Sequence, residues 1–259
     1  MEKITTHLWY DQEAKAAAEL YTAIFPNSRI KFSSVLNNTP SGNVDMLTID
    51  LMGQEFSLIS AGPLFKFNPS VSFHVACKTT ELIDKLWAKL SEGGTILMEL
   101  GKYPFSEKYG WLQDKFGVSW QLMYVGDQLP SEKITPVLMF IGQNSGKAEE
   151  AINFYSSVFK NSQTLNVMRR GSDEAPEKEG TIKYAAFQLD GREFGAMDSV
   201  LDHKFQFNEA ISFMVHCQDQ AEIDYYWEKL SADPKAEQCG WLKDKYGLSW
   251  QIVPIGMSQ

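Results

Sequence analysis

The sequence predicts an α+β fold made of two tandem copies of one domain, because a long motif and the order of strand and helix patterns both occur twice. The segment Gly110–Gln121 reads GWLQDKFGVSWQ, and Gly240–Gln251 reads GWLKDKYGLSWQ. Both tryptophans, the glycines and the aspartate stay in register, which marks a duplication. We therefore place the copies at residues 1–127 and 131–259, two domains of ordinary size.

The spacing between matching residues varies along the two copies, which locates insertions and deletions. Matching aromatic residues in the middle of the copies lie further apart than the two closing motifs do. The second copy therefore gains residues early and loses residues before its motif. Because such changes fall in surface loops, loops are expected near Gly142–Gly146, near Gly171–Gly180 and at Gly93–Tyr109. The acidic segment Ser172–Glu179 is expected to be a solvated loop tip.

The first half of copy one predicts a strand, a helix and three further strands. Ile4–Tyr10 has the composition of a strand. Glu13–Phe25 carries apolar residues at helical spacing, and Pro26 ends the pattern. Three segments with strand patterns follow, at Arg29–Leu36, Val44–Leu51 and Glu55–Ser60.

The second half of copy one repeats this order. Val71–Cys77 predicts a strand, and Thr80–Leu90 predicts a helix that ends before Gly93. A strand near Thr95–Leu100 follows, and Val118–Tyr124 is the last. Each domain is therefore predicted to hold two β-α-β-β-β units, and the chain to hold four.

Strand residues alternate between two faces, so each strand presents one apolar and one mixed face. On Val71–Cys77 the apolar residues share one face, and Ser72, His74 and Ala76 share the other. The apolar faces are expected to lie under the helices. The mixed faces of two units are expected to curl into a trough, which is a natural ligand site.

Composition excludes several classes of partner. The net charge of −9 argues against nucleic acid, which requires a basic surface. No apolar run reaches the ~18 residues of a membrane span. The start Met1-Glu2-Lys3 has no apolar signal region, so a cytoplasmic location is expected. Cys77 and Cys217 match between the copies and are expected to be buried thiols rather than a disulfide.

The chain resembles the PhnB-like family of the vicinal oxygen chelate superfamily, which includes glyoxalase I, bleomycin-resistance proteins and extradiol dioxygenases. The resemblance rests on Phe25–Arg29 (FPNSR), on Gly93–Met98 (GGTILM) and on the repeated closing motif, and it covers nearly the whole chain. It implies tandem glyoxalase-like domains, each a curved mixed β-sheet trough with helices outside. The two domains would form a pseudo-dimer within one chain, and a further homodimer is compatible with this.

Two activities find little support in the sequence. Some members of the family are named 3-demethylubiquinone 3-methyltransferases, but we find no glycine-rich turn after a strand that would hold S-adenosylmethionine. Gly142–Ala148 lies between a strand and a helix and suggests a phosphate loop. Its spacing is one residue short, and Ala148 stands where the Ser or Thr of such a loop would bind magnesium.

The resemblance also implies one divalent metal, held by His and Glu side chains on inner strand faces, that would stabilise an enolate or similar anion. The matching residues of copy one are Thr5, Ser57, His74 and Gln121, with His7 two residues after Thr5 and pointing the same way. His74, Gln121 and His7 are thus the metal candidates, for zinc, nickel, manganese or iron. Glutamine is a weak ligand, so binding would be loose. The matching residues of copy two, which offer almost no ligands, are Thr135, Val137, Gly195, Met214 and Gln251.

Alternative interpretations stay open for these residues. His74 is either a histidine hydrogen-bonded within the trough or a metal or substrate ligand. Gln121 either makes a structural hydrogen bond or contacts a ligand, and Trp9 either packs or stacks on a ligand. Met98–Tyr109, which has no full counterpart in copy two, is either an aromatic lid or a surface loop.

The leading prediction is a small-molecule binding protein of the bleomycin-resistance type that sequesters or senses an apolar or aromatic compound. The alternative is a metal-dependent lyase, isomerase or dioxygenase acting on vicinal oxygens, and a third possibility is an interaction module without a ligand. The predicted ligand-binding residues are Thr5, His7, Trp9, Ser57, His74 and Gln121.

Overall fold

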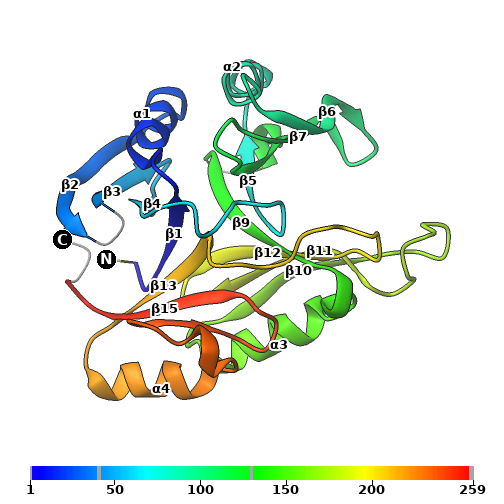
Figure 1. Ribbon diagram of the computed structural model, residues 1–259. Helices are drawn as coiled ribbons and strands as arrows, with labels where there is room; N and C mark the ends of the chain where they lie inside the picture. Colours follow the sequence, from blue (N-terminus) through cyan, green and yellow to red (C-terminus); the bar gives the residue numbers. More distant parts are fainter. Residues whose placement is uncertain (1, 40–41, 129–130, 257–259) are drawn as a thin grey trace. The chain divides into compact units, whose positions relative to one another are not determined.

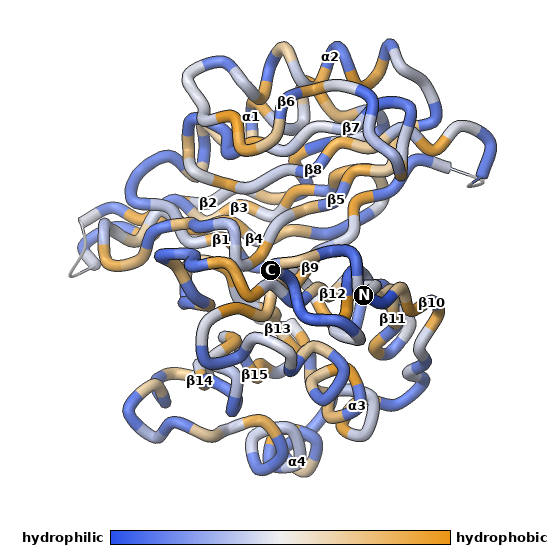
Figure 2. Tube along the Cα trace, turned by 90° about the vertical axis from the view of Figure 1, so that its right-hand side faces the viewer, coloured by the Kyte–Doolittle hydropathy of each residue, from blue (hydrophilic) through white to orange (hydrophobic). Residues whose placement is uncertain are grey.

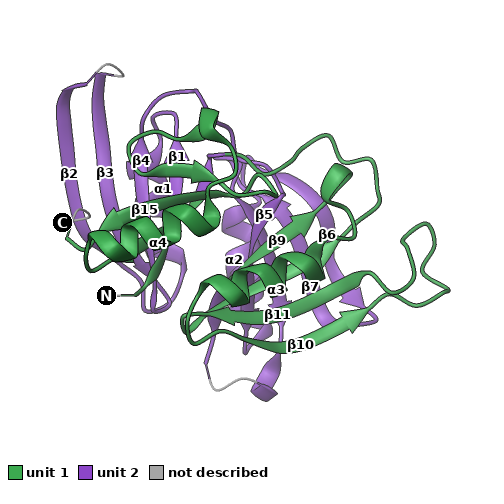
Figure 3. Cartoon of the chain, turned by 90° about the horizontal axis from the view of Figure 1, so that it is seen from below, with its two compact units in different colours: residues 1–5, 135–208, 212–257 green, residues 6–134, 209–211, 258–259 purple. Residues whose placement is uncertain are grey.

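The structure is a computed structural model that describes residues 2–39, 42–128 and 131–256. It has the predicted α+β fold, with mixed β-sheets and helices, and the chain divides into two compact units (Figure 3). Among the described residues, unit 1 comprises 2–5, 135–208 and 212–256, and unit 2 comprises 6–134 and 209–211. The predicted boundaries at 1 and 259 lie outside the described residues. The units differ from the predicted copies at three short segments, 2–5, 131–134 and 209–211.

Copy one contains every element that its sequence patterns predict, with ends shifted by a few residues (Figure 1). These elements belong to unit 2, except that Ile4 and Thr5, the first two residues of the first strand, belong to unit 1. The elements in chain order are β1 (Ile4–Tyr10), α1 (Ala14–Ile24), β2 (Arg29–Thr39), β3 (Gly42–Leu51), β4 (Gln54–Ser60), β5 (Val71–Cys77), α2 (Thr80–Leu90), β6 (Thr95–Tyr103), β7 (Ser106–Gln113), β8 (Ser119–Tyr124) and the short 3-10 helix η1 (Gly126–Gln128).

Copy two repeats this order with a shorter final hairpin. Its predicted loop at Gly171–Gly180 is confirmed, whereas the predicted loop at Gly142–Gly146 begins with a short 3-10 helix. The elements are β9 (Lys133–Phe140), the 3-10 helix η2 (Gly142–Asn144), α3 (Ala148–Val158), β10 (Gln163–Arg169), β11 (Ile182–Leu189), β12 (Arg192–Asp198), β13 (Ile211–Cys217), α4 (Gln220–Leu230), the 3-10 helix η3 (Pro234–Ala236), β14 (Trp241–Lys243) and β15 (Ser249–Pro254).

Unit 2 contains two groups of four strands that belong to different sheets. In the N-terminal group, β1 runs parallel to β4, and β3 and β2 continue antiparallel. In the C-terminal group, β5 runs parallel to β8, and β7 and β6 continue antiparallel. Each parallel pair encloses one helix in the sequence, as a crossover connection requires. Unit 1 follows the same plan in β9-β12-β11-β10 and β13-β15-β14.

The helices cover the apolar faces of these sheets, as predicted. Helix α1 buries Ala17 and Tyr21 over β3 and β4, and α2 buries Ile83 and Leu86 over β7 and β8. Hydrophobic and hydrophilic residues alternate along α2 in Figure 2, as expected for a helix with one buried side. Over the described residues, no helix is long and apolar enough to cross a membrane.

The closing motif of copy one is built around a buried carboxylate. Asp114 Oδ2 accepts hydrogen bonds from Tyr21 Oη at 2.6 Å and from Trp120 Nε1 at 2.9 Å. Its Oδ1 accepts from the backbone N–H groups of Phe116 at 2.9 Å and Val118 at 3.1 Å. Burial raises the pKa of Asp114, and these hydrogen bonds oppose that rise. One side chain thus joins α1, the β7–β8 turn and β8.

Copy two repeats this arrangement atom for atom. Asp244 accepts from Tyr155 Oη at 2.7 Å and from Trp250 Nε1 at 2.9 Å. It also accepts from the backbone N–H groups of Tyr246 at 2.9 Å and Leu248 at 3.1 Å. The pKa of Asp244 is likewise raised by burial. The repeated motif is therefore a structural element rather than a reactive one.

The segment between α2 and β8 differs from its prediction. Loops at Gly93–Tyr109, and a lid or loop at Met98–Tyr109, were expected, but β6 and β7 form a hairpin there. The rings of Tyr103, Phe105 and Tyr109 pack on one another, with centroids 5.0 to 5.6 Å apart. The ring contacts stabilise the turn, and local sequence spacing does not reveal them. The deletion in copy two removes the counterpart of β6.

The two matched cysteines are free and buried, as predicted. Cys77 and Cys217 lie on β5 and β13, and neither is exposed. Burial raises the pKa of the Cys77 thiol to about 12 and of the Cys217 thiol to about 11. Both thiols are therefore protonated at neutral pH.

We expect Gly110→Ala to destabilise the protein by about 1–3 kcal/mol, because overpacking a core is costly. A Cβ atom on Gly110 would lie 2.5 Å from the ring of Trp87 on α2. Gly101→Ala is the control, because a Cβ atom there meets nothing within 4 Å. Urea unfolding of both variants measures the difference. Equal midpoints for the two variants would contradict the close approach of α2 to β7.

Candidate functional site

A row of polar side chains crosses the mixed face of the N-terminal strand group in unit 2. His7 on β1 lies beside Ser57 on β4, and Ser57 lies beside Thr48 on β3. His7 is only 5 % exposed, and burial lowers the pKa of its imidazole to about 3. The imidazole is therefore neutral at physiological pH. The structure thus brings together two of the predicted ligand-binding residues, His7 and Ser57.

The outer part of the same face is apolar. Trp9 lies beside Ile59 on β4, which lies beside Met46 on β3. The indole of Trp9 donates to the Gly62 carbonyl at 2.8 Å and packs edge-on against Phe65. These contacts fix the ring and account for its place in the fold. Sequence reasoning missed Ile59 and Met46, although strand alternation on Glu55–Ser60 and Val44–Leu51 could have indicated them.

The predicted residue Thr5 lies elsewhere. It belongs to unit 1, where its hydroxyl lies 3.0 Å from Nε2 of His216. Both side chains are buried, at 2 % exposure each. Sequence reasoning did not select His216, because a position two residues after Met214 on β13 matches no ligand position of the family. The shared strand face of Met214 and His216 was the available signal.

His74 lies on the mixed face of the C-terminal strand group. It pairs in register with Gln121 on β8, so these two predicted residues are also neighbours. His74 Nε2 lies 3.3 Å from Sδ of Met123. Burial, and to a smaller extent the positive charge of Lys133, lowers the pKa of His74 to about 4. The half-buried imidazole is therefore neutral at pH 7.

Both ends of the Gln121 amide are hydrogen-bonded within the protein. Oε1 accepts from Tyr109 Oη at 2.8 Å, and Nε2 donates to Ser72 Oγ at 2.7 Å. Gln251 of copy two similarly donates to Ser212 Oγ at 2.9 Å. These bonds favour the structural interpretation of Gln121, since its oxygen is already engaged.

Aromatic and thioether groups complete this surface. Trp111 lies beside Gln121 and donates to Ser119 Oγ at 2.8 Å, and Tyr109 lies beside Met123. Trp111, Met123 and His74 are half-buried, whereas most of the sheet residues around them are buried. We call this surface the His74 face; it comprises Ser72, His74, Tyr109, Trp111, Gln121 and Met123.

The corresponding N-terminal face of copy two is filled by its own side chains. Gly195 of unit 1 matches Ser57, and a Cβ atom there would lie 2.9 Å from Val137 and 3.1 Å from the Tyr184 ring. The tyrosine stands where copy one has Met46. This close packing leaves no room for a ligand beside Gly195.

The residues do not fit the divalent metal that the fold family implies. Across residues 2–39, 42–128 and 131–256, no three His, Cys, Asp or Glu side chains gather closely enough to hold a metal ion. His7 and His74 lie on strands of different sheets. Gln121 uses its oxygen for Tyr109. The tentative set of His74, Gln121 and His7 is therefore not assembled as a metal-binding group.

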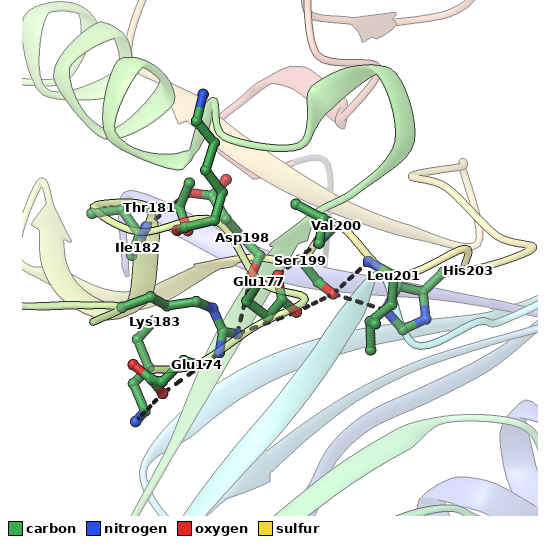
Figure 4. A network of polar contacts seen from close by, with 12 residues as sticks. Glu174, Glu177, Thr181, Ile182, Lys183, Asp198, Ser199, Val200, Leu201 and His203 are labelled. Atoms are coloured by element: carbon green, nitrogen blue, oxygen red, sulfur yellow. Dashed lines mark hydrogen bonds and ion pairs between the residues drawn. The ribbon is translucent and has the colours of Figure 1, made fainter. Parts of the chain in front are cut away.

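A polar network in unit 1 contains a serine, a histidine and a glutamate but lacks the geometry of a nucleophile (Figure 4). Ser199 Oγ donates to Glu177 at 2.7 Å and lies 3.2 Å from His203 Nε2. A nucleophilic serine would donate to the histidine instead. Glu177 also accepts from the backbone of Val200 at 2.9 Å. The expected solvated tip at Ser172–Glu179 is thus wrong for Glu177, which accepts hydrogen bonds from the loop that follows β12.

The segment Gly142–Ala148 has no free helix terminus for a phosphate. Asp198 Oδ1 accepts from the backbone N–H of Ala148 at 3.1 Å, at the start of α3. The Asn144 side chain donates to the Tyr246 carbonyl at 2.7 Å. A carboxylate already occupies the place that an anion would take, which supports the rejection of a phosphate loop.

Both copies match one protein family. The family model described as 3-demethylubiquinone-9 3-methyltransferase matches residues 2–123 and again residues 132–253. The chain belongs to this family. The two matches also agree with the tandem duplication. Comparison with curated proteins gave no match.

Solved structures place this family within the glyoxalase-like fold. A PhnB protein from Bacillus cereus is 43% identical over 48% of this chain and 100% of its own, with a TM-score of 0.46. Glyoxalase I from Zea mays is 14% identical over 97% of this chain and 93% of its own, with a TM-score of 0.55. A Bacillus subtilis protein described as a dioxygenase is 10% identical over 96% and 84%, with a TM-score of 0.56. The last two share the fold alone.

We expect acid to destabilise the protein between about pH 6.5 and pH 4, because the unfolded chain binds protons there that folded His7 and His74 do not. Their folded pKa values are lowered, so their contribution is present above pH 6.5 and is lost as the pH falls. In His7→Gln and in His74→Gln, the free energy of unfolding should fall less steeply as the pH decreases. His7, the more buried, should have the larger effect.

Urea titrations from pH 4 to pH 8 measure these slopes, and subtracting wild type from variant removes the contribution of the carboxylates. Unchanged slopes in both variants would contradict the neutral state of the two imidazoles.

Proposed function

We propose that the chain binds a small apolar or aromatic molecule on the His74 face and holds it without transforming it. The observation that carries this proposal is the composition of the face. It combines a neutral imidazole, a thioether and an indole, all half-buried, with an amide fixed by two hydrogen bonds. Small-molecule sites typically combine aromatic and other apolar side chains with a few oriented polar groups.

The chemistry of the face favours binding over catalysis. Aromatic and thioether groups contribute stacking and dispersion contacts. A neutral His74 offers one hydrogen bond, which would orient a ligand. General acid–base catalysis is most efficient when the pKa lies near the working pH, and the pKa of His74 is lowered to about 4. The six predicted residues also include no carboxylate that could serve as a second titrating group.

Two other functions receive less support. A metal-dependent lyase, isomerase or dioxygenase would agree with the descriptions of the glyoxalase I and dioxygenase fold neighbours. It lacks a metal-binding group among the described residues. The methyltransferase in the family description would require a site for S-adenosylmethionine, and the sequence offers no glycine-rich turn for one.

A screen of aromatic and apolar compounds, read by tryptophan fluorescence, tests the proposal. We expect saturable binding, and we expect His74→Ala and Trp111→Phe to weaken it about 5- to 30-fold, equivalent to about 1–2 kcal/mol. Leu201→Ala is the control, because it removes an exposed side chain from the other copy. Binding that none of these variants changes would place the ligand elsewhere.

Elemental mass spectrometry of protein purified without chelator separates binding from metal catalysis. We expect divalent metal well below one ion per chain, in wild type and in His74→Ala alike, because no three-ligand group is assembled. Urea unfolding with and without added zinc should give the same midpoint. One divalent ion per wild-type chain, lost in His74→Ala, would favour the metal-dependent alternative.

A further inference from the structure

A nitrogen and a sulfur donor meet on the His74 face. His74 on β5 and Met123 on the adjacent parallel strand β8 place Nε2 and Sδ 3.3 Å apart. Both side chains are half-buried, so the pair is accessible from one side.

The nature of these donors selects a class of metal. Thioether sulfur is a soft ligand that prefers monovalent copper, and imidazole also binds copper well. The same pair gives a poor site for zinc or manganese, which take more donors and harder ones. We propose that His74 and Met123 bind one soft monovalent cation, Cu(I) or Ag(I), in place of the divalent ion that the fold family implies.

The observed contact can open to admit such an ion. Zinc makes bonds of about 2.0 Å to nitrogen and about 2.3 Å to sulfur. An ion with bonds of similar length in a linear site would hold its two donors roughly 4.3 Å apart. The present separation of 3.3 Å must therefore grow by roughly 1 Å. Methionine has three rotatable bonds and adapts to such shifts.

The positive charge of Lys133 lowers the affinity of the pair for every cation and favours monovalent over divalent ions. Lys133 at the start of β9 is the charged group whose field lowers the pKa of His74. That field repels any cation at His74, and it repels a divalent ion twice as strongly as a monovalent one. Copy two has Met214 and Val253 at the corresponding positions, so the His–Met pair is not repeated there.

Silver titration followed by NMR of the methionine methyl groups tests the site directly. Ag(I) alone is the probe, because it does not change oxidation state. The background variant is Cys239→Ser, since Cys239 is an exposed thiol that would itself bind silver. We expect one equivalent to shift the Met123 methyl and His74 ring signals. One equivalent of Zn(II) should shift neither.

Three variants decide the assignment. His74→Gln and Met123→Leu should each lower silver affinity at least tenfold, and Lys133→Gln should raise it. Met168→Leu is the control, an exposed methionine on β10. Because Met-to-Leu changes conserve volume, unchanged unfolding midpoints would show that Met123→Leu is folded.

Three results would overturn the proposal. If Ag(I) leaves the Met123 methyl unshifted, the contact is only an N–H···S hydrogen bond. If Met123→Leu binds as tightly as the background variant, sulfur is not a ligand. If binding disappears in Cys77→Ser or Cys217→Ser, the buried thiols hold the ion. The test does not depend on an organic ligand, so it is independent of the proposed function.

Discussion

The buried carboxylates of Asp114 and Asp244 are the constraint on which each copy depends. A desolvated carboxylate is costly unless donors surround it, and each one accepts four hydrogen bonds. Two donors come from a helix tyrosine and a strand tryptophan, and two come from the turn that the aspartate itself begins. The first helix of the copy, the final turn and the final strand therefore have one compatible arrangement.

This constraint also sets the chemistry of the opposite face. Trp120 must point toward the helices to reach Asp114, so strand alternation sends Gln121 and Met123 to the mixed face. Gln121 is then held by Tyr109 and Ser72, and Met123 comes to rest against His74. The motif that identifies the family thus acts on the candidate site indirectly, by fixing which side chains face it.

The two copies share this framework and differ in what they place on it. Copy two has Gly195 at the position of Ser57, and the side chains of Tyr184 and Val137 pack against this glycine. Over its described residues, 131–256, it also lacks a counterpart of β6. At the matching places copy one has the half-buried Ser57 and Met46 and the buried His7. The same framework therefore carries polar side chains on this face in copy one and packed side chains in copy two.

The sequence by itself determined the duplication, the strand and helix order outside the β6–β7 hairpin, the covered faces and the buried cysteines, because periodicity and capping are local properties. It also placed His74 and Gln121 on one face. Only the tertiary structure decided their partners. Thr5 meets His216, His74 meets Met123, and Glu177 meets Ser199 across long stretches of sequence. Such pairs depend on strand register and on the path of the loops. The alternation of side chains along a strand is the same for every register, so the sequence pattern does not reveal which residues meet.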